Sequence, residues 1–562
     1  MNQKIKISLF VFCVFGACAL FSCQKNDAVK ADLLLTNGKI WTVDPSQPVA
    51  EAVAVWHGKI LAVGSTADLV QLAGPATKVM DLQGKLLLPG FSDNHTHFLS
   101  GGQWLSGVKL KDAKDEREFG ERLARKSAEL SAGAWILDGT WDHDNWPGGN
   151  LPTAALIDQY VSDRPVFVTR YDGHMSVANS LVLKMAGIDA NTPDPPGGVI
   201  VRKAGSNEPA GVLKDAAQSL VWRIVPEPSR EEIEQALLAA MQEAARVGVT
   251  SLQDMNLTSE TLSIYQDFLR QGKMTVRVDG RWPLFRWRDL AKLGISKNFR
   301  DGEWLKIGGL KGFVDGSLGS STALFYEPYV QDASTRGIFV NDPQTLRRTI
   351  IAADSSGLHI AVHAIGDSAN AYLLEVFAEA IEANGGTDHR FRIEHAQHIH
   401  PNDFTRFADL GVIACVQPYH AIDDGRWAEQ RIGHERCKTT YPFRSFLDNG
   451  VKMTFGSDWT VAPLDPILGI DAAVTRRTID GANPDGWFPE QKISVEEAIE
   501  AYTLSAAFAA FDEEIKGSIT PGKLADMVVL SQDILTIPAN AIVNTEVLYT
   551  IVGGKVVFEK GE

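Results

Sequence analysis

The chain has 562 residues, of which 44% are hydrophobic and 22% charged, a composition typical of globular proteins. This length exceeds what one small hydrophobic core serves, so we expect one large domain and a smaller one. The formal net charge is -16 at pH 7, and because nucleic-acid binding needs a basic surface, this acidic balance argues against a nucleic-acid partner.

The first residues have the layout of a targeting signal. Two lysines precede an apolar stretch over residues 7–21, which is too short to span a bilayer comfortably and leads into Cys23. This layout resembles a bacterial lipoprotein signal, so residues 1–22 are predicted to be a signal peptide, Cys23 the lipidated first residue of the mature chain and residues 23–30 a polar tether. The globular part would then be lipid-anchored to a membrane of the bacterial cell envelope, in the periplasm or at the cell surface. An ordinary cleaved signal is the alternative.

Both ends of the remaining chain carry hairpin signals. Turn pairs that contain glycine lie between apolar runs at residues 37–40, 57–60 and 553–556. We therefore expect residues 31–88 and 511–562 to pair into one small β-sandwich domain, although they lie at opposite ends of the sequence.

The middle of the chain alternates between short apolar runs and stretches of helical periodicity. That periodicity is clear over residues 230–247 and 369–383. Repeated strand and helix units favour a parallel sheet, so the predicted fold class is α/β, with a (β/α)8 TIM-type barrel over residues 89–510. The stretch of about residues 100–245 is too long for one such unit and is predicted to hold an inserted subdomain. The expected strands cover residues 250–255, 275–278, 305–314, 359–363, 391–395, 412–417 and 452–455.

Two cysteines, Cys415 and Cys437, remain in the body of the protein once the signal is excluded. An oxidising compartment would allow a disulfide between them. Cys415 lies within an apolar run, so we favour the interpretation that it is a small buried hydrophobic residue.

Side chains that bind metals follow several of the expected strands. His95 and His97 alternate on one strand, so both imidazoles face the same way and can hold one divalent cation. His363 and His395 follow two further strands and are candidate ligands through neutral imidazole nitrogens. Because the carboxyl ends of barrel strands meet at one mouth, these four histidines are expected to converge.

Three other histidines are not expected to bind the metal. His398 and His400 also form a His-x-His pair, but they lie in a loop past a strand, so we expect them to face solvent or to act behind the ligands. His359 would lie at the opposite end of the strand that carries His363, away from the site.

A lysine and an aspartate complete the candidate set. Lys311 lies inside an apolar run, where its charge is costly, and carbamylation by carbon dioxide would convert it into an anionic bridging ligand. The alternative is a lysine paired with Asp315. Asp458 follows the last expected strand, where its carboxylate can take the proton of the attacking water and hand it to a leaving group. The alternative for Asp458 is a helix N-cap.

As a set, these motifs resemble the metal site of the amidohydrolase superfamily. The phrases at residues 88–91, 311–317, 363–367 and 456–459 are most similar to the branch that includes N-substituted formamide deformylases, amidohydrolase family 3. The resemblance implies a barrel with split β-sandwich flanks and one or two divalent metal ions, usually zinc, at its mouth. It also implies that a metal-activated hydroxide attacks a carbonyl while Asp458 acts as the base. The implied ligands are His95, His97, carbamylated Lys311, His363, His395 and Asp458.

Substrate contacts are expected from the inserted subdomain and from the strand exits. Residues 170–174 resemble a segment that folds over the mouth in this branch, which implies that His174 hydrogen-bonds the substrate carbonyl or its oxyanion. A loop-fixing contact is the alternative for His174. Residues just past strand exits are expected to line the pocket: Gln417, His420 and Trp459. Trp141, Trp146 and Trp427 would add apolar walls, or pack in the core or on the surface.

The predicted activity is metal-dependent hydrolysis of a C–N bond in a small molecule, of amide, N-formyl or N-acyl type. Two other functions stay open: hydrolysis of an ester or lactone at the same metals, and ligand binding by a catalytically idle barrel. Intact Lys311 and Asp458 argue against an idle barrel, because a binding protein needs no proton shuttle. The sequence leaves the substrate, the number of metals and the oligomeric state open, a homo-oligomer included.

Overall fold

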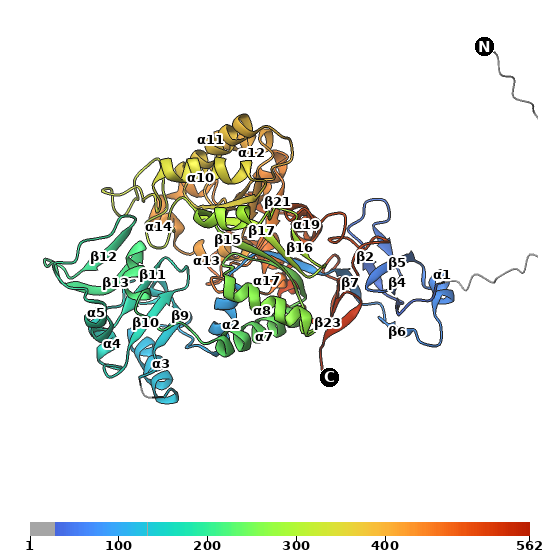
Figure 1. The fold of residues 1–562 in the computed structure, drawn as a ribbon, viewed down its shortest axis with the longest axis horizontal. Coiled ribbons are helices and arrows are strands. Elements are labelled where there is room, and N and C mark those ends of the chain that lie inside the picture. Colours follow the sequence, from blue (N-terminus) through green and yellow to red (C-terminus); the bar gives the residue numbers. More distant parts are fainter. Residues whose placement is uncertain (1–28, 132, 562) are drawn as a thin grey trace, which may run out of the picture.

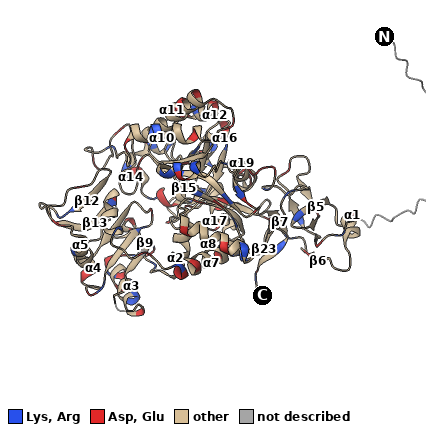
Figure 2. Cartoon of the chain, viewed as in Figure 1, with Lys and Arg blue, Asp and Glu red and all other residues tan. Residues whose placement is uncertain are grey.

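The computed structural model describes residues 29–131 and 133–561. Three parts of the described chain follow one another along the long axis: a subdomain inserted into the barrel, the barrel itself and a β-sandwich (Figure 1). Figure 2 shows acidic and basic residues interspersed over all three parts. The described residues include no helix that is long and apolar enough to cross a bilayer. The predicted lipidation of Cys23 concerns residues outside the described ranges.

The central part is a barrel of parallel strands. In the described chain, eight strands run in the order β8, β14, β15, β17, β18, β19, β20 and β21, and a parallel bridge between Thr96 and Trp459 brings the two ends of this sheet together. The predicted (β/α)8 barrel is therefore confirmed. The strands are β8 (Phe91–Thr96), β14 (Val249–Asp254), β15 (Arg277–Pro283), β17 (Leu305–Phe313), β18 (His359–Ala364), β19 (Arg392–His395), β20 (Ile413–Val416) and β21 (Met453–Phe455), and the short β16 (Arg300–Asp301) pairs with β17.

Helices cover the outside of the barrel. The longest predicted ones form as expected: α7 (Arg230–Arg246) begins at a capping box of Ser229 and Glu232, and α11 (Asp367–Asn384) buries an apolar face. The other helices of the barrel part are α2 (Phe98–Ser106), α8 (Ser259–Arg270), α9 (Trp287–Lys292), α10 (Pro343–Ser355), α12 (Phe404–Asp409), α13 (Pro418–Asp424), α14 (Ala428–Ile432), α15 (His434–Cys437), α16 (Phe443–Asp448), α17 (Pro466–Thr475), α18 (Val495–Tyr502) and α19 (Leu504–Ala509).

The β-sandwich is built from both ends of the chain, as predicted. The decisive pairing is antiparallel, between β7 (Leu86–Pro89) and β22 (Met527–Leu530), with Leu88 opposite Val528. One sheet has the order β24, β23, β22, β7, β2, β3 and the other the order β5, β4, β1, β6. The remaining strands are β1 (Leu33–Thr36), β2 (Lys39–Trp41), β3 (Val49–Ala50), β4 (Ala52–Trp56), β5 (Lys59–Gly64), β6 (Lys78–Asp81), β23 (Val547–Val552) and β24 (Lys555–Glu559).

The inserted subdomain has a sheet of its own. Its order is β12, β13, β11, β10, β9, and α3, α4 and α5 pack on it around two apolar cores. Trp141 and Trp146 are buried in one of these cores, so they pack in the subdomain and do not wall the substrate pocket. The elements are β9 (Ile136–Trp141), β10 (Val166–Arg170), β11 (Met175–Ala178), β12 (Gly198–Arg202), β13 (Pro209–Asp215), α3 (Glu116–Glu129), α4 (Ala154–Asp158) and α5 (Ser180–Ala186).

Cys415 and Cys437 are both free and buried. Cys415 lies on β20 in a small apolar cluster with Ile413 and Ala509. The disulfide alternative is therefore wrong, and the interpretation of Cys415 as a buried hydrophobic residue is confirmed.

Candidate metal centre

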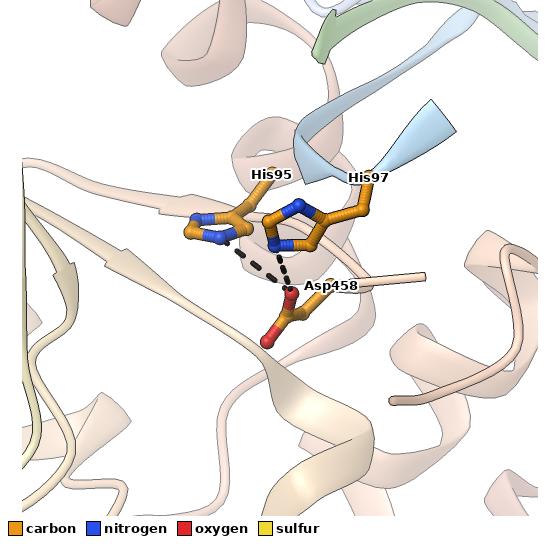
Figure 3. Close-up of side chains that lie close together, drawn as sticks. All are labelled: His95, His97 and Asp458. Atoms are coloured by element: carbon orange, nitrogen blue, oxygen red, sulfur yellow. Dashed lines mark ion pairs between the residues drawn. The ribbon is translucent and has the colours of Figure 1, made fainter. Parts of the chain in front are cut away.

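Two histidines and one carboxylate meet at the carboxyl end of the barrel strands. His95 lies on β8, His97 directly precedes α2, and Asp458 follows β21. Asp458 Oδ1 is 3.3 Å from His97 Nε2 and 3.6 Å from His95 Nε2 (Figure 3). The donor atoms of these three residues all lie within 4.8 Å of one another, and so do those of His395, His420 and Asp458. Asp458 therefore belongs to two groups of side chains that can hold a cation.

The remaining predicted ligands surround this carboxylate. Lys311 Nζ, on β17, is 3.2 Å from His95 Nε2. The ring centroid of His395 is 4.8 Å from that of His95 and 4.5 Å from that of His363. The structure thus brings all six residues predicted as ligands to one mouth of the barrel.

The chemistry of these donors fits a divalent metal ion. Asp458 Oδ1 and His420 Nε2 are buried atoms with no hydrogen-bond partner in the described chain. Polar atoms left in this state cost free energy, and coordination to a cation would recover it. Imidazole nitrogens combined with a carboxylate form a ligand set that zinc and similar ions accept.

Two buried side chains fix the tautomers of these imidazoles. Glu394 Oε2 pairs with His95 Nδ1, and Gln417 Oε1 lies 2.8 Å from His395 Nδ1. Both oxygens accept hydrogen bonds, so each Nδ1 carries the proton and each Nε2 keeps its lone pair for a metal. Gln417 was expected to line the pocket; it is instead fully buried and orients His395.

The electrostatics of the site favour neutral imidazoles and an ionised carboxylate. Burial, together with the nearby Lys311, lowers the pKa of His95 to about 4. Burial also lowers the pKa of Lys311 to about 8, so part of its amine is neutral near pH 7, the form that reacts with carbon dioxide. Burial alone would raise the pKa of Asp458, but His95, His97 and His395 outweigh it and hold that pKa well below its usual range.

Two alternatives raised by the sequence are wrong. Asp315 accepts hydrogen bonds from backbone N–H groups, and no ion pair in the described chain joins it to Lys311. Asp458 caps no helix, because the next helix, α17, begins at Pro466 and is capped by Asp465.

The backbone is strained where the ligands leave the strands. His395, Ala396 and Asp458 have φ angles of +74°, +41° and +55°, the left-handed region that side chains other than glycine rarely adopt. Such strain persists only where the surrounding structure over-determines it, and it clusters at functional sites.

A cavity lies between the inserted subdomain and the barrel mouth. His174, in the turn between β10 and β11, lines it together with His363, His395 and Asp458, and the ring centroid of His174 is 5.3 Å from that of His363. His420 lines the same cavity, as predicted. The geometry is that expected of a substrate pocket above the candidate metal site.

A profile of the amidohydrolase family matches residues 78–558. The chain belongs to the amidohydrolase family. It is 42% identical over 540 residues to the protein LONG AFTER FAR-RED 3 of Arabidopsis thaliana, covering 94% of this chain and 91% of that protein. It is 28% identical over 549 residues to the N-substituted formamide deformylase of Arthrobacter pascens, covering 94% of this chain and 98% of that protein.

Solved structures agree with this family. An uncharacterized metal-dependent hydrolase from Pyrococcus horikoshii matches with a TM-score of 0.74 and 29% identity, over 90% of this chain and 99% of that chain. Family and structural neighbours together support a metal-dependent hydrolase.

One expected pocket residue of this amidohydrolase lies elsewhere. The ring of Trp459 packs against Phe98 and would collide with any side chain at Gly101 of α2, so it belongs to the core under the mouth. Trp427 lines the cavity, which agrees with its interpretation as an apolar wall.

Three histidines of the amidohydrolase were not expected to bind the metal: His359, His398 and His400. His359 lies at the far end of β18, where its Nδ1 is 2.8 Å from Arg281, as expected for a residue away from the site. His398 is buried and pairs with Thr440, so of the two positions expected for it the solvent-facing one is wrong, and the one behind the ligands stays a prediction. His400 is partly exposed and accepts a hydrogen bond from the backbone N–H of Asn402.

Three acidic residues near the site were not among those predicted. Glu394 alternates with Arg392 on β19, a pattern that could have marked a polar barrel interior. Asp215 pairs with His174 across two strands of the subdomain. Asp424 lines the cavity and accepts a 2.6 Å hydrogen bond from Tyr441, and burial raises the pKa of Asp424 to about 7.

Proposed function

We propose that this amidohydrolase cleaves a C–N bond of a small molecule, of amide, N-formyl or N-acyl type. The observation that carries the proposal is the position of Asp458, whose carboxylate lies within 4.0 Å of nitrogens from His95, His97 and His395. A carboxylate shared in this way is placed to move a proton between the nucleophile and the leaving group. Similarity to an N-substituted formamide deformylase supports a C–N bond as the target.

The residues present would hold one or two divalent ions, zinc being the simplest choice for this donor set. His95 and His97 would hold one ion and His363 and His395 the other, with a carbamylated Lys311 between them. Such ions, when bound, polarise a carbonyl group and lower the pKa of water.

The side chains of the protein supply the proton transfers and the orientation. Asp458 takes a proton from the attacking water and passes it to the departing nitrogen, so that the amine leaves in its neutral form. Across the cavity, His174 hydrogen-bonds the carbonyl oxygen as negative charge develops on it. Trp427 and Val461 line the same cavity and exclude water around the scissile bond.

Matched pairs of compounds test the type of bond. Each pair consists of an N-formyl or N-acyl amine and the corresponding ester of the same acyl group. We expect a higher kcat/KM for the amide of a pair. Turnover of esters without turnover of any amide would overturn the proposal and favour the ester or lactone alternative.

Asp458→Asn tests the base. The amide cannot accept a proton from water, so kcat should fall by about 10²–10⁴-fold, the usual contribution of a general base. Steady-state kinetics at saturating metal measure the effect, with Asp448→Asn, at an exposed position on α16, as the matched control. An Asp458→Asn enzyme with the kcat of the wild type would remove the proposed base.

A further inference from the structure

His174 and Asp215 form a pair across two strands of the inserted subdomain. His174 directly precedes β11, and Asp215 is the last residue of the neighbouring antiparallel strand β13. We propose that Asp215 is a positioning residue, which fixes the orientation of the His174 imidazole during hydrolysis. This inference rests on the function proposed above.

Two hydrogen bonds join the residues of the pair. His174 Nδ1 is 2.7 Å from Asp215 Oδ1, and the backbone N–H of Asp215 donates to the carbonyl oxygen of His174 at 2.8 Å. A carboxylate only accepts, so Nδ1 carries a proton and the ring has one orientation. The anionic partner also stabilises the doubly protonated ring, in which Nε2 carries the proton that it donates to a carbonyl oxygen. In the described chain, Nε2 of His174 has no hydrogen bond to protein, which leaves it available to a bound molecule.

The pair lies beside the candidate metal ligands. The cavity that His174 lines also contains His363, whose ring centroid is 5.3 Å away. A Cβ atom at Gly316, in the barrel loop after β17, would lie 3.0 Å from Asp215 Oδ1, so this loop packs directly on the pair. Asp215 therefore acts on the reaction through His174 at the boundary between subdomain and barrel.

The carboxylate of Asp215 is buried in an environment that is unfavourable for an unpaired polar atom. Its side chain is only 3% exposed, and its Oδ2 has no hydrogen-bond partner in the described chain. A buried carboxylate oxygen without a partner costs free energy, and the contact that Oδ1 makes is with His174.

The backbone of Asp215 gives an independent sign of the same role. Its φ of +46° and ψ of -122° belong to a region that glycine adopts readily and residues with a Cβ avoid. Strain of this kind, at a position where glycine would relieve it, points to a function of the aspartate side chain.

Fixing the imidazole affects the transition state more than the bound ground state. The interaction of Nε2 with the carbonyl strengthens as the oxygen gains charge, so a misoriented ring lowers kcat more than it raises KM. Substitution of a residue with a purely structural role would not lower kcat while leaving KM nearly unchanged.

Asp215→Gly separates function from stability. Because glycine relieves the backbone strain, we expect the thermal midpoint to stay or rise while kcat falls about 10-fold or more and KM changes less than about threefold. Gln83→Gly is the matched control, since Gln83 lies in an exposed turn at φ +52° far from the site and should gain stability without a change in kcat.

Asp215→Asn and His174→Gln complete the test. Asparagine carries no negative charge, so it no longer stabilises the doubly protonated imidazole whose Nε2–H donates to the carbonyl oxygen, and kcat should fall again. The double variant Asp215→Asn with His174→Gln should be no slower than His174→Gln alone, because both changes remove one interaction. Asp215 variants with the kcat of the wild type, or effects that add fully with His174→Gln, would overturn the proposal.

Nitrogen NMR of histidine-labelled protein detects the hydrogen bond between His174 and Asp215 without any substrate. The signal of a protonated Nδ1, assigned to His174 by its loss in His174→Gln, should change in Asp215→Asn. If the wild type cleaves no C–N bond but this change occurs, the proposed function fails and the pairing stands. If the signal does not change, the pairing itself is refuted.

Discussion

The imidazoles at the centre of the site depend on partners that lie farther from the cavity. Glu394 is fully buried between His95 and Arg392, whose Nε donates to it at 2.8 Å. Burial alone would raise the pKa of Glu394, but Arg392 and His95 hold that pKa far below its usual range, so the side chain stays anionic. An anionic partner on Nδ1 makes the other nitrogen of His95 a stronger metal ligand.

Glu394→Gln should therefore weaken metal binding without removing a ligand. A neutral amide lowers the basicity of the imidazole, and we expect about 10–100-fold weaker binding. Competition with a chromophoric chelator measures the affinity, and Glu500→Gln, exposed at the surface of the barrel part, is the control. Equal affinities in the two variants would show that Glu394 does not support the site.

At the scale of elements, the hairpin of β10 and β11 is attached to the barrel by a buried ionic network. Arg170 is fully buried and pairs with Asp144 at 2.6 Å and with Asp172 at 2.7 Å. From the barrel, Arg431 reaches Asp144 at 3.3 Å, and Ser317 donates to Asp172 at 2.6 Å. These contacts fix the turn that carries His174 above the mouth.

Arg170→Ala should break this attachment. It removes the buried cation that Asp142, Asp144 and Asp172 share. Removal of one member of a buried pair costs about 3–5 kcal/mol of unfolding free energy. Urea unfolding measures the loss, and Arg125→Ala, exposed on α3, is the control expected to change stability by less than about 0.5 kcal/mol. A loss in Arg170→Ala as small as in the control would mean that the network does not hold the hairpin.

The strands that carry the ligands could be predicted because each combines an apolar run with a polar residue at its exit. The strand expected at residues 275–278 instead covers Arg277–Pro283, so it begins two residues later and includes buried polar residues that an apolar pattern does not mark. There Arg281 meets Gln253 and His359, so a polar stretch is buried by mutual hydrogen bonds. A hydrophobicity pattern cannot show such a polar interior.

The direction of side chains just past a strand could not be predicted. Trp459 was expected in the pocket, but α2 passes close enough for its ring to fill the space above Gly101. The side chain of Gln417 likewise turns toward a partner on another element, because its Oε1 accepts a hydrogen bond from His395 of β19. Both outcomes depend on tertiary packing between segments far apart in sequence.

At the scale of the whole molecule, the site exists only when the barrel is closed. His95 on the first barrel strand and Asp458 after the last meet across the bridge of Thr96 with Trp459. The turn of the inserted subdomain that carries His174 then lines the cavity at this mouth. Metal binding and closure of the barrel are therefore expected to stabilise each other.

Metal analysis of the purified full chain tests the central claim most directly. The wild type should carry at least one divalent ion per chain, and the double variant His95→Asn with His97→Asn should carry at least one ion fewer while remaining folded by circular dichroism. A wild type that binds no divalent ion when zinc is supplied, or a double variant that retains the full metal content, would contradict the account.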